Sequence, residues 1–186
     1  MCCVVLRVDE LDKLGGTPCP QLAETNGCSI HNTRPHICRA YRCLWLQGGL
    51  DDADRPDRLD AVIDILTEGL TTRLSIQEAA PGAFDGSARL QEIANAHRSS
   101  MPVRVVEAGN VLDPDRPFRV LLANGEEQRV LGERIELYRD GQKIGERHLP
   151  WLDRWARRLA VHFRKRRVRR ILTPDSESRP FPRSGP

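Results

Sequence analysis

Cysteine is absent from the last 143 residues of this 186-residue chain, and only three of its 29 basic residues are lysines. The sequence also lacks long apolar runs, since the longest, residues 1–6, has six members. A membrane-spanning helix needs ~20 apolar residues and a signal-peptide core needs ~7–15. The sequence therefore predicts no membrane span and no classical secretion, and we expect a cytoplasmic protein.

Apolar and aromatic residues are scarce as well. Hydrophobic residues make up 39% of the chain, aromatic residues 5% and charged residues 30%, whereas globular domains average ~45–50% apolar residues. At ~150 residues per domain, the length corresponds to about one domain. These values predict one folded domain with a modest core.

Charge is unevenly distributed along the chain. Residues 1–150 contain 18 Lys and Arg against 23 Asp and Glu, a formal charge of −5. Residues 151–172 contain nine Lys and Arg against the single Asp153, a formal charge of +8. The sequence thus joins a mildly acidic body to one strongly basic segment.

All the cysteines lie near the N-terminus, at Cys2, Cys3, Cys19, Cys28, Cys38 and Cys43. Six thiols could pair as disulfides, but stable disulfides are rare in reducing cytosol. Glycine and proline interrupt residues 1–58 every few positions, so no helix longer than about two or three turns is expected there. Metal ligation can supply the folding energy that such a segment lacks. The clustering therefore favours metal binding over redox-active thiols or inert buried cysteines.

The residue types limit the choice of metal. Thiolates suit zinc, copper(I) or the iron of an iron-sulfur cluster far better than magnesium or calcium. Zinc ribbons and ferredoxin-type clusters usually take ligands from CxxC pairs, and the sequence contains no such pair. The cysteines alone therefore predict a thiolate site and leave zinc and iron open.

Composition and turn signals divide the chain into four parts. These are a loop-rich, cysteine-rich metal-binding lobe (residues 1–58), a mainly antiparallel β/α body (59–149), a basic amphipathic helix (150–172) and a flexible tail (173–186). The expected fold class is α+β, in which the N-terminal cysteine lobe is mounted on a mainly antiparallel sheet with two helices.

Short turn motifs predict the elements of the body. Within residues 60–77, two segments in which apolar and polar residues alternate flank a three-residue hairpin loop at 67–69. Ser87 is expected to cap a helix that ends near residue 99. The Asn-Gly pair at 124–125 and the Asp-Gly pair at 140–141 predict hairpin turns within a four-strand meander.

The sequence around the cysteines resembles a known family. Residues 18–46 read PCPQLAETNGCSIHNTRPHICRAYRCLWL, and the motifs in this stretch are Cys19, Gly27-Cys28 with Ile30, Arg34-Pro35, and Cys38-Arg39 with Tyr41. Their order is similar to the downstream half of the CxxCxxCC cysteine-cluster family, the YkgJ-like zinc- or iron-chelating domain. Met1-Cys2-Cys3 matches only the closing CC of the family motif, so the resemblance predicts further cysteines upstream of Met1.

The resemblance implies that the cysteine thiolates chelate zinc or iron, an iron-sulfur cluster included, and it assigns no reaction. The candidate ligands are Cys2, Cys3, Cys19, Cys28, Cys38 and Cys43. Six thiols suffice for one zinc ion held by four cysteines or for one iron-sulfur cluster. Cys43 is the weakest candidate, because it could instead pack beside Trp45.

Polar neighbours of the cysteines have expected roles of their own. His31 and His36 lie between candidate ligands, and we expect them at the surface or beside the ligands rather than on the metal. Arg34 and Arg39 could offset the negative charge of the thiolates, with an exposed loop position as the alternative.

No other motif in the sequence carries recognisable chemistry. The chain has no P-loop, GxGxxG, HExxH or GxSxG motif. Asp51, Asp52 and Asp54 lack the glycine and glutamate spacing of a calcium-binding loop, so a solvated acidic loop is expected there. Enzyme status is therefore open, and an enzyme that uses the thiols or a cluster for redox chemistry is the first alternative to a metal-binding protein.

The basic segment predicts an amphipathic helix. Trp155, Leu159 and Phe163 share one face, which we expect to dock on the sheet and leave the arginines in solvent. The basic residues are Arg154, Arg157, Arg158, Arg164, Lys165, Arg166, Arg167, Arg169 and Arg170. Their face is either a plain solvated surface or a site for an anionic partner such as nucleic acid, acidic lipid or an acidic protein. A nucleic-acid-binding module that uses this helix is the second alternative.

Overall fold

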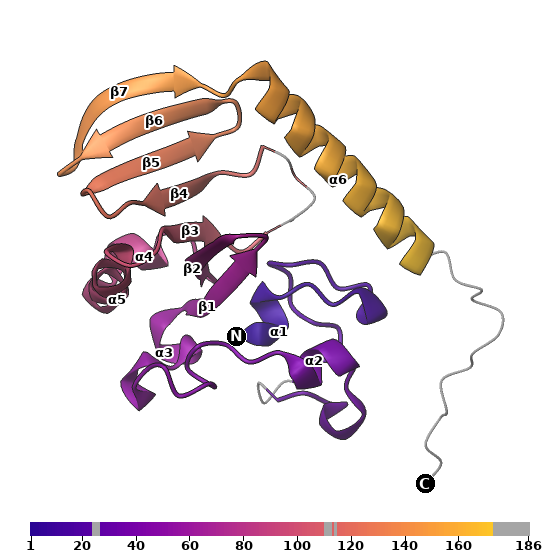
Figure 1. The fold of residues 1–186 in the computed structure, drawn as a ribbon. Helices are drawn as coiled ribbons and strands as arrows, with labels where there is room; N and C mark the ends of the chain where they lie inside the picture. The colour runs from indigo at the N-terminus through magenta and orange to yellow at the C-terminus, as the bar shows by residue number, and fades with distance from the viewer. Residues whose placement is uncertain (24–26, 110–112, 114, 173–186) are drawn as a thin grey trace, which may run out of the picture.

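A seven-stranded sheet organises the molecule. The computed structural model describes residues 1–23, 27–109, 113 and 115–172, the last nine by their backbone alone. The strands follow one another across the sheet in the order β1 to β7. The N-terminal lobe lies at the β1 end, and helix α6 leaves the β7 end and extends past the rest of the chain (Figure 1). This arrangement confirms the expected α+β class.

The strands are β1 (Ala61–Glu68), β2 (Thr71–Glu78), β3 (Val103–Glu107), β4 (Phe118–Leu121), β5 (Glu126–Leu131), β6 (Arg134–Arg139) and β7 (Gln142–His148). Neighbours pair antiparallel except β2 and β3, which are parallel. Strands β4 to β7 are the predicted meander, with Asp140 and Gly141 both at positive φ in the two-residue turn between β6 and β7. The predicted three-residue loop between the first two strands is wrong, because Glu68 pairs with Thr71 and leaves two residues in the turn.

The helices are α1 (Cys2–Val5), α2 (His36–Ala40), α3 (Pro56–Leu59), α4 (Ala83–Gly86), α5 (Ala88–Arg98) and α6 (Trp151–Leu172), with 3-10 turns η1 (Asp9–Leu11), η2 (His31–Thr33) and η3 (Asp52–Asp54). The two longest, α5 and α6, are the two that the sequence predicts. The Ser87 hydroxyl accepts a hydrogen bond from the Leu90 N–H at 3.2 Å, as expected of an N-cap. Within the described part of residues 1–58, no helix exceeds five residues, in agreement with the glycine and proline content.

The main core lies between α5 and one face of β1, β2 and β3. Its most buried side chains include Ile63, Leu74, Ile76, Leu90, Ala94, Val103 and Val105. The opposite face of β1 is also covered, because Val62 packs against Val5 and Cys43 of the lobe. Strand β1 is therefore buried on both faces, and the lobe is packed directly on the sheet.

Backbone contacts fix the lobe against the sheet. The Leu44 N–H donates to the Ile63 carbonyl at 2.8 Å, which places the chain after α2 alongside β1. Gly16 adopts a φ of +79°, and a Cβ at this position would lie 2.7 Å from the Gly109 backbone nitrogen. Only glycine fits such a close approach between the lobe and the chain that follows β3.

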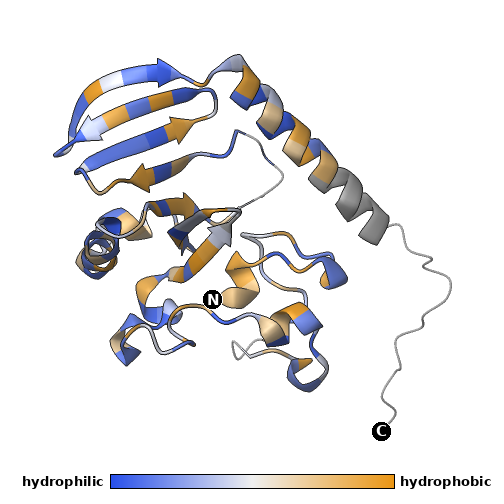
Figure 2. Cartoon of the chain, viewed as in Figure 1, coloured by the Kyte–Doolittle hydropathy of each residue, from blue (hydrophilic) through white to orange (hydrophobic). Residues whose placement is uncertain are grey.

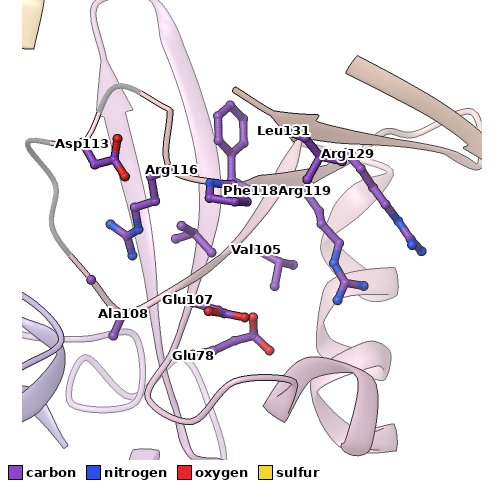
Figure 3. A pocket seen from close by; sticks show the side chains of 13 residues that line it. Glu78, Val105, Glu107, Ala108, Asp113, Arg116, Phe118, Arg119, Arg129 and Leu131 are labelled. Atoms are coloured by element: carbon purple, nitrogen blue, oxygen red, sulfur yellow. The ribbon is translucent and has the colours of Figure 1, made fainter. Parts of the chain in front are cut away.

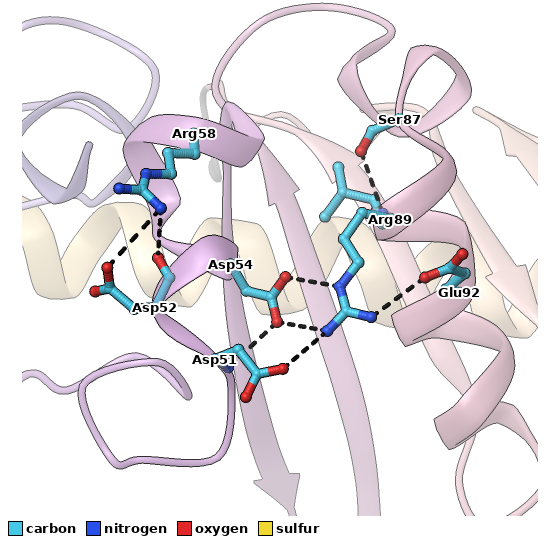
Figure 4. A network of polar contacts seen from close by, with 8 residues as sticks. Asp51, Asp52, Asp54, Arg58, Ser87, Arg89 and Glu92 are labelled. Carbon is cyan, nitrogen blue, oxygen red and sulfur yellow. Dashed lines mark hydrogen bonds and ion pairs between the residues drawn. The ribbon is translucent and has the colours of Figure 1, made fainter.

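The expected solvated acidic loop is wrong for Asp54. Its side chain is buried, and its two oxygens accept hydrogen bonds from Arg89 of α5, at 2.7 Å from Nε and 2.8 Å from Nη2 (Figure 4). Asp51 and Asp54 also cap η3 reciprocally, each side chain bonding to the backbone of the other. Asp51 and Asp52 are exposed. Burial of Asp54 depends on its pairing with an arginine 35 residues away, which local sequence does not reveal.

The expected docking of the apolar face of α6 is also wrong. Trp155 is 59% exposed and Phe163 57% exposed, and Leu159 is exposed as well. Orange apolar positions alternate with blue positions along α6 (Figure 2). The apolar face of α6 therefore points away from the sheet, up to the last residue whose side chain is described.

Arginines attach the start of α6 to the sheet body, and the helix also runs close to η1 of the lobe. Arg154 and Arg158 both form ion pairs with Glu133, in the turn between β5 and β6. The Arg157 guanidinium lies 5.5 Å from the centre of the Phe118 ring. The side chains of residues 164–172 and the expected tail at 173–186 lie outside the part that is described. No described helix is both long and apolar enough to cross a bilayer.

Candidate metal centre

Five of the six cysteines line one cavity in the N-terminal lobe. The cavity has a volume of about 440 Å³, and we call it the thiol cavity. Its cysteines are Cys2, Cys3, Cys19, Cys28 and Cys38. They come from α1, from the loops that follow it and from α2, so the fold gathers thiols that are up to 36 residues apart in the sequence.

Backbone hydrogen bonds bring the first of these segments together. The Gly16 N–H donates to the Val4 carbonyl at 2.9 Å, and the Cys19 N–H donates to the Cys3 carbonyl at 2.8 Å. These two bonds place Cys19 beside Cys3 at the start of the chain. An isolated antiparallel bridge between Leu22 and Cys28 then returns the chain to the cavity.

The remaining thiol of the cavity comes from a short helix. Pro35 precedes α2 and has the extended backbone that suits a helix start, and Cys38 lies in the middle of the five-residue helix. The Arg39 N–H donates to the Pro35 carbonyl at 3.2 Å, which closes the first turn. The Arg-Pro and Cys-Arg motifs of the sequence therefore line one side of the cavity.

Cys43 stands apart from the cavity. Its side chain is 1% exposed and packs with Val5 and Val62, with Trp45 partly buried against the same cluster. Cys43 is thus placed in an apolar cluster beside Trp45, the alternative that the sequence left open.

Electrostatic contacts sort the thiols into two groups. Burial raises the pKa of the Cys3 thiol, and nearby Cys19 and Cys28 raise it further. Burial likewise raises the pKa of Cys38, and Cys3, Cys19, the Glu10 carboxylate and Cys28 raise it further. Burial raises the pKa of Cys2, and both Cys43 and Cys3 raise it further. One group therefore comprises Cys3, Cys19, Cys28 and Cys38, which we call the thiol tetrad, and Cys2 forms a second group with Cys43 that adjoins the tetrad at Cys3.

A buried lysine lies against the tetrad. Lys13 is only 3% exposed, and its ammonium donates to the carbonyls of Val4 at 2.8 Å, Leu14 at 3.0 Å and Leu6. Burial lowers the pKa of Lys13, while Cys19 and Cys3 oppose that shift. Three carbonyl acceptors hold the Lys13 ammonium beside the tetrad. Deprotonated cysteines at this distance would stabilise its positive charge.

Arginines add to the positive charge of the thiol cavity. Arg34, Arg39 and Arg42 line it together with Lys13, and its lining contains no Asp or Glu among the described residues. The Nε of Arg34 is buried and has no hydrogen-bond partner in the described part of the chain. Among the histidines, His31 lines the cavity and His36 does not. The cavity thus offers cations and an unpaired donor to an anionic centre.

The thiols are gathered around the cavity without being joined at one point. Among the described residues, no three His, Cys, Asp or Glu side chains lie close enough together to hold a metal ion as they stand. The donor chemistry fits zinc or an iron-sulfur cluster, because four thiolates on one zinc ion carry a formal charge of −2 that nearby cations offset. Ligation would therefore require the thiols to move inward from the cavity walls.

A buried polar pair lies next to the second thiol group. The Tyr41 hydroxyl donates to a carboxylate oxygen of Asp64, which is 4% exposed on β1. Burial raises the pKa of Asp64, and the hydrogen bond from Tyr41 partly offsets the shift. Burial and the neighbouring carboxylate raise the pKa of Tyr41. The hydrogen bond between Tyr41 and Asp64 connects the lobe to the sheet body. The tyrosine is protonated at neutral pH, because its pKa is raised.

A second cavity, of about 290 Å³, lies at the ends of β2 and β3. Glu78 and Glu107 are partners across these parallel strands, and their carboxylates lie close together (Figure 3). Arg116 also lines this cavity, and its Nη2 is buried without a hydrogen-bond partner in the described structure. The described lining contains no cysteine or histidine, so this cavity is separate from the thiols.

Sequence reasoning missed Lys13, Asp64 and the carboxylates of the second cavity. A signal for Lys13 was present, because the chain has 26 arginines and only three lysines, one of them within the cysteine segment. Asp64 and Glu78 lie in ordinary strand sequences and carry no local signal.

No protein-family model, curated protein or solved structure matches the chain.

Proposed function

We propose that the protein binds a metal centre, either zinc or an iron-sulfur cluster, through the clustered cysteine thiolates of its N-terminal lobe. The thiol tetrad would hold the metal. A bound zinc ion would stabilise the fold, whereas a cluster would supply electron transfer. The resemblance to the cysteine-cluster family, carried by the motifs of residues 18–46, points to the same chemistry.

The convergence of cysteines on one cavity carries the proposal. Thiols from three segments of the chain line the cavity, although most of the surrounding lobe has no regular secondary structure. Chance burial would leave cysteines dispersed among apolar side chains, as it leaves Cys43. The thiol tetrad, four of the five thiols that line the cavity, matches the four-cysteine ligand set of zinc sites and of iron-sulfur clusters.

The cations of the cavity support an anionic occupant. Lys13 holds a buried positive charge beside the tetrad, and Arg34, which lines the cavity, has a buried Nε without a hydrogen-bond partner among the described residues. Without thiolate charge, a buried ammonium is costly even when it is hydrogen-bonded. Lys13 would orient and stabilise the thiolates from its fixed position on three carbonyl groups, and Arg34 would donate to a thiolate sulfur.

Anaerobic purification followed by elemental analysis and a visible spectrum tests the proposal. We expect about one metal centre per chain. A colourless protein with zinc would indicate a structural centre, and a brown protein with iron would indicate a cluster. Protein from metal-replete cells that contains no zinc, iron or copper would contradict the proposal.

Two serine variants locate the ligands. Cys28→Ser removes a thiol of the tetrad and should abolish stoichiometric metal binding, because a four-thiolate site cannot lose a ligand without a large loss of affinity. Cys43→Ser is the matched control, since it removes a thiol outside the cavity lining and should leave the metal content unchanged. Equal metal content in both variants would overturn the assignment of the tetrad.

A further inference from the structure

Helix α6 exposes a continuous apolar stripe. Its members are Trp151, Leu152, Trp155, Leu159 and Phe163, each between 36% and 67% exposed. At 100° per residue these positions cover about 120° of the helix surface, the width of a typical buried helix face. Such a face is normally covered in a folded protein, and here it is turned to solvent.

Contacts on the opposite side of α6 keep the stripe outward. Glu133 pairs with both Arg154 and Arg158, and Arg157 stacks over the Phe118 ring. Turning the stripe toward the sheet would break these contacts and expose Phe118. The helix is therefore held with its apolar side free.

Charge identifies what covers the stripe. Residues 151–172 carry a formal charge of +8, whereas residues 1–150 carry −5. Residues 164–172 alone contain six Lys and Arg and no Asp or Glu. A surface that covers the stripe must therefore combine apolar groups with negative charge. Such a surface would be attracted to α6 and repelled by the acidic body.

From these features we infer that α6 is a binding site for an anionic lipid surface, on which it lies with the apolar stripe in the headgroup boundary. Amphipathic helices with Trp, Leu and Phe on one side and Arg on the other bind bilayers in this way. Trp side chains favour the membrane–water interface, and a basic segment is attracted by anionic headgroups.

Other occupants fit the observations less well. A second copy of α6 would bring two formal charges of +8 together, which opposes pairing through the stripe. Nucleic acid would neutralise the arginines but would leave the five apolar side chains in water. This inference is independent of the proposed metal centre, so either can fail alone.

Vesicle binding by the full-length chain tests the inference. Trp151 and Trp155 are two of three tryptophans, so a Trp45→Phe background makes the emission report on α6 alone. Vesicles of phosphatidylglycerol and phosphatidylcholine should shift this emission to the blue and sediment the protein. Vesicles of phosphatidylcholine alone should bind it at least about tenfold more weakly, because the headgroup attraction is absent.

A matched pair of variants assigns the binding to the stripe. The triple variant Trp155→Gln, Leu159→Gln and Phe163→Gln keeps good helix formers on α6 and should weaken sedimentation about tenfold or more. The control Leu70→Gln with Ile144→Gln removes two exposed apolar side chains elsewhere and should bind as the unmodified chain does. Circular dichroism of the triple variant confirms that the helix is intact.

Three results would overturn the inference. The first is absence of binding to anionic vesicles at low salt. This result is also expected if another protein, rather than a lipid surface, covers the stripe. The second is equal vesicle binding by the triple variant and its control. The third is salt-dependent retention on DNA or RNA that survives the triple variant while vesicles fail to bind, which would assign the helix to nucleic acid.

Discussion

The cysteine lobe (residues 1–58) and the sheet body (residues 59–149) are held together by different forces. Of the 22 buried apolar residues in the described structure, only five lie in the lobe, and two of those five are cysteines. The sheet body has a hydrogen-bonded ladder across seven strands and a core packed on α5. The lobe has helices of three to five residues and two isolated bridges.

The difference bears on where the proposed metal centre would contribute to folding. Burial of apolar area is the dominant favourable contribution to folding, and most of the buried apolar residues of the described structure lie in the sheet body. The lobe instead buries thiols, the Lys13 ammonium and the Asp54 carboxylate. Buried polar groups stabilise a fold only when each has its partner. We therefore expect the lobe to depend on the proposed metal centre, and the sheet body to be independent of it.

Metal removal should separate the two regions most clearly. Structural zinc contributes about 10–16 kcal/mol of apparent binding free energy in finger peptides. A chelator should therefore remove amide protection from the lobe and leave β1, β2, β3 and α5 protected in hydrogen exchange. Unchanged protection of residues 1–43 after complete loss of metal would show that the lobe folds on its own.

The next largest effect should come from Lys13→Met. Methionine fills a similar volume but leaves the carbonyls of Val4, Leu6 and Leu14 without their donor, so the lobe should lose about 3 kcal/mol. Urea unfolding followed by the emission of Trp45 in the lobe measures the loss. Lys143→Met is the control, because Lys143 is exposed and its solvent-screened ion pairs should contribute far less to the free energy of unfolding.

Local patterns in the sequence predicted most of the sheet body. Alternating apolar residues and turn dipeptides act between neighbours in the chain, so the β1–β2 hairpin, the Ser87 cap and the meander could be read directly. The loop at 67–69 was predicted one residue too long, because Glu68 continues the strand pairing. The resemblance of residues 18–46 to a metal-chelating family stays a prediction.

The features that could not be predicted from the sequence depend on contacts between residues that are far apart in the chain. An amphipathic pattern defines the two faces of α6 but not which face meets the sheet, and Glu133 and Phe118 draw the arginine face inward. Burial of Asp54 depends on Arg89, and burial of Lys13 depends on carbonyl groups of α1 and its neighbours. For the cysteines, spacing alone did not distinguish the thiol tetrad from Cys43.

Asp54→Ala should weaken the junction between the lobe and the sheet body. The substitution breaks a two-bonded ion pair with Arg89. Loss of a buried pair typically costs 3–5 kcal/mol, but the Arg89 side chain is 45% exposed and water screens it. We therefore expect about 2 kcal/mol in chemical unfolding. Asp52→Ala, which removes an exposed carboxylate paired with Arg58, should cost under about 0.5 kcal/mol.

Acid should act on the two buried aspartates with opposite signs. Arg89 lowers the pKa of Asp54, so its contribution is complete above the unfolded pKa of ~3.9 and is lost as the pH falls through the lower folded value. Burial raises the pKa of Asp64, so its contribution is complete below ~3.9 and is lost as the pH rises through the folded value. We therefore expect the free energy of unfolding, measured from pH 3 to 7, to fall most at pH 7 for Asp54→Ala. For Asp64→Asn, the change relative to the unmodified chain should be most favourable at pH 7. Parallel pH curves for the two variants would contradict these shifts.

The smallest expected effect concerns α6, which belongs to neither region. A helix docked through an apolar face would lose several kcal/mol from a carboxylate at Leu159, because the charge would be buried without a partner. Leu159 is exposed on the stripe, so Leu159→Asp should change the free energy of unfolding by less than about 0.5 kcal/mol. Leu90→Ala is the comparison, since it creates a cavity in the core between α5 and the sheet and should cost about 2–5 kcal/mol. Thermal and urea unfolding of both variants measure the contrast, and a loss at Leu159 as large as that at Leu90 would mean that the helix docks through its apolar face in solution.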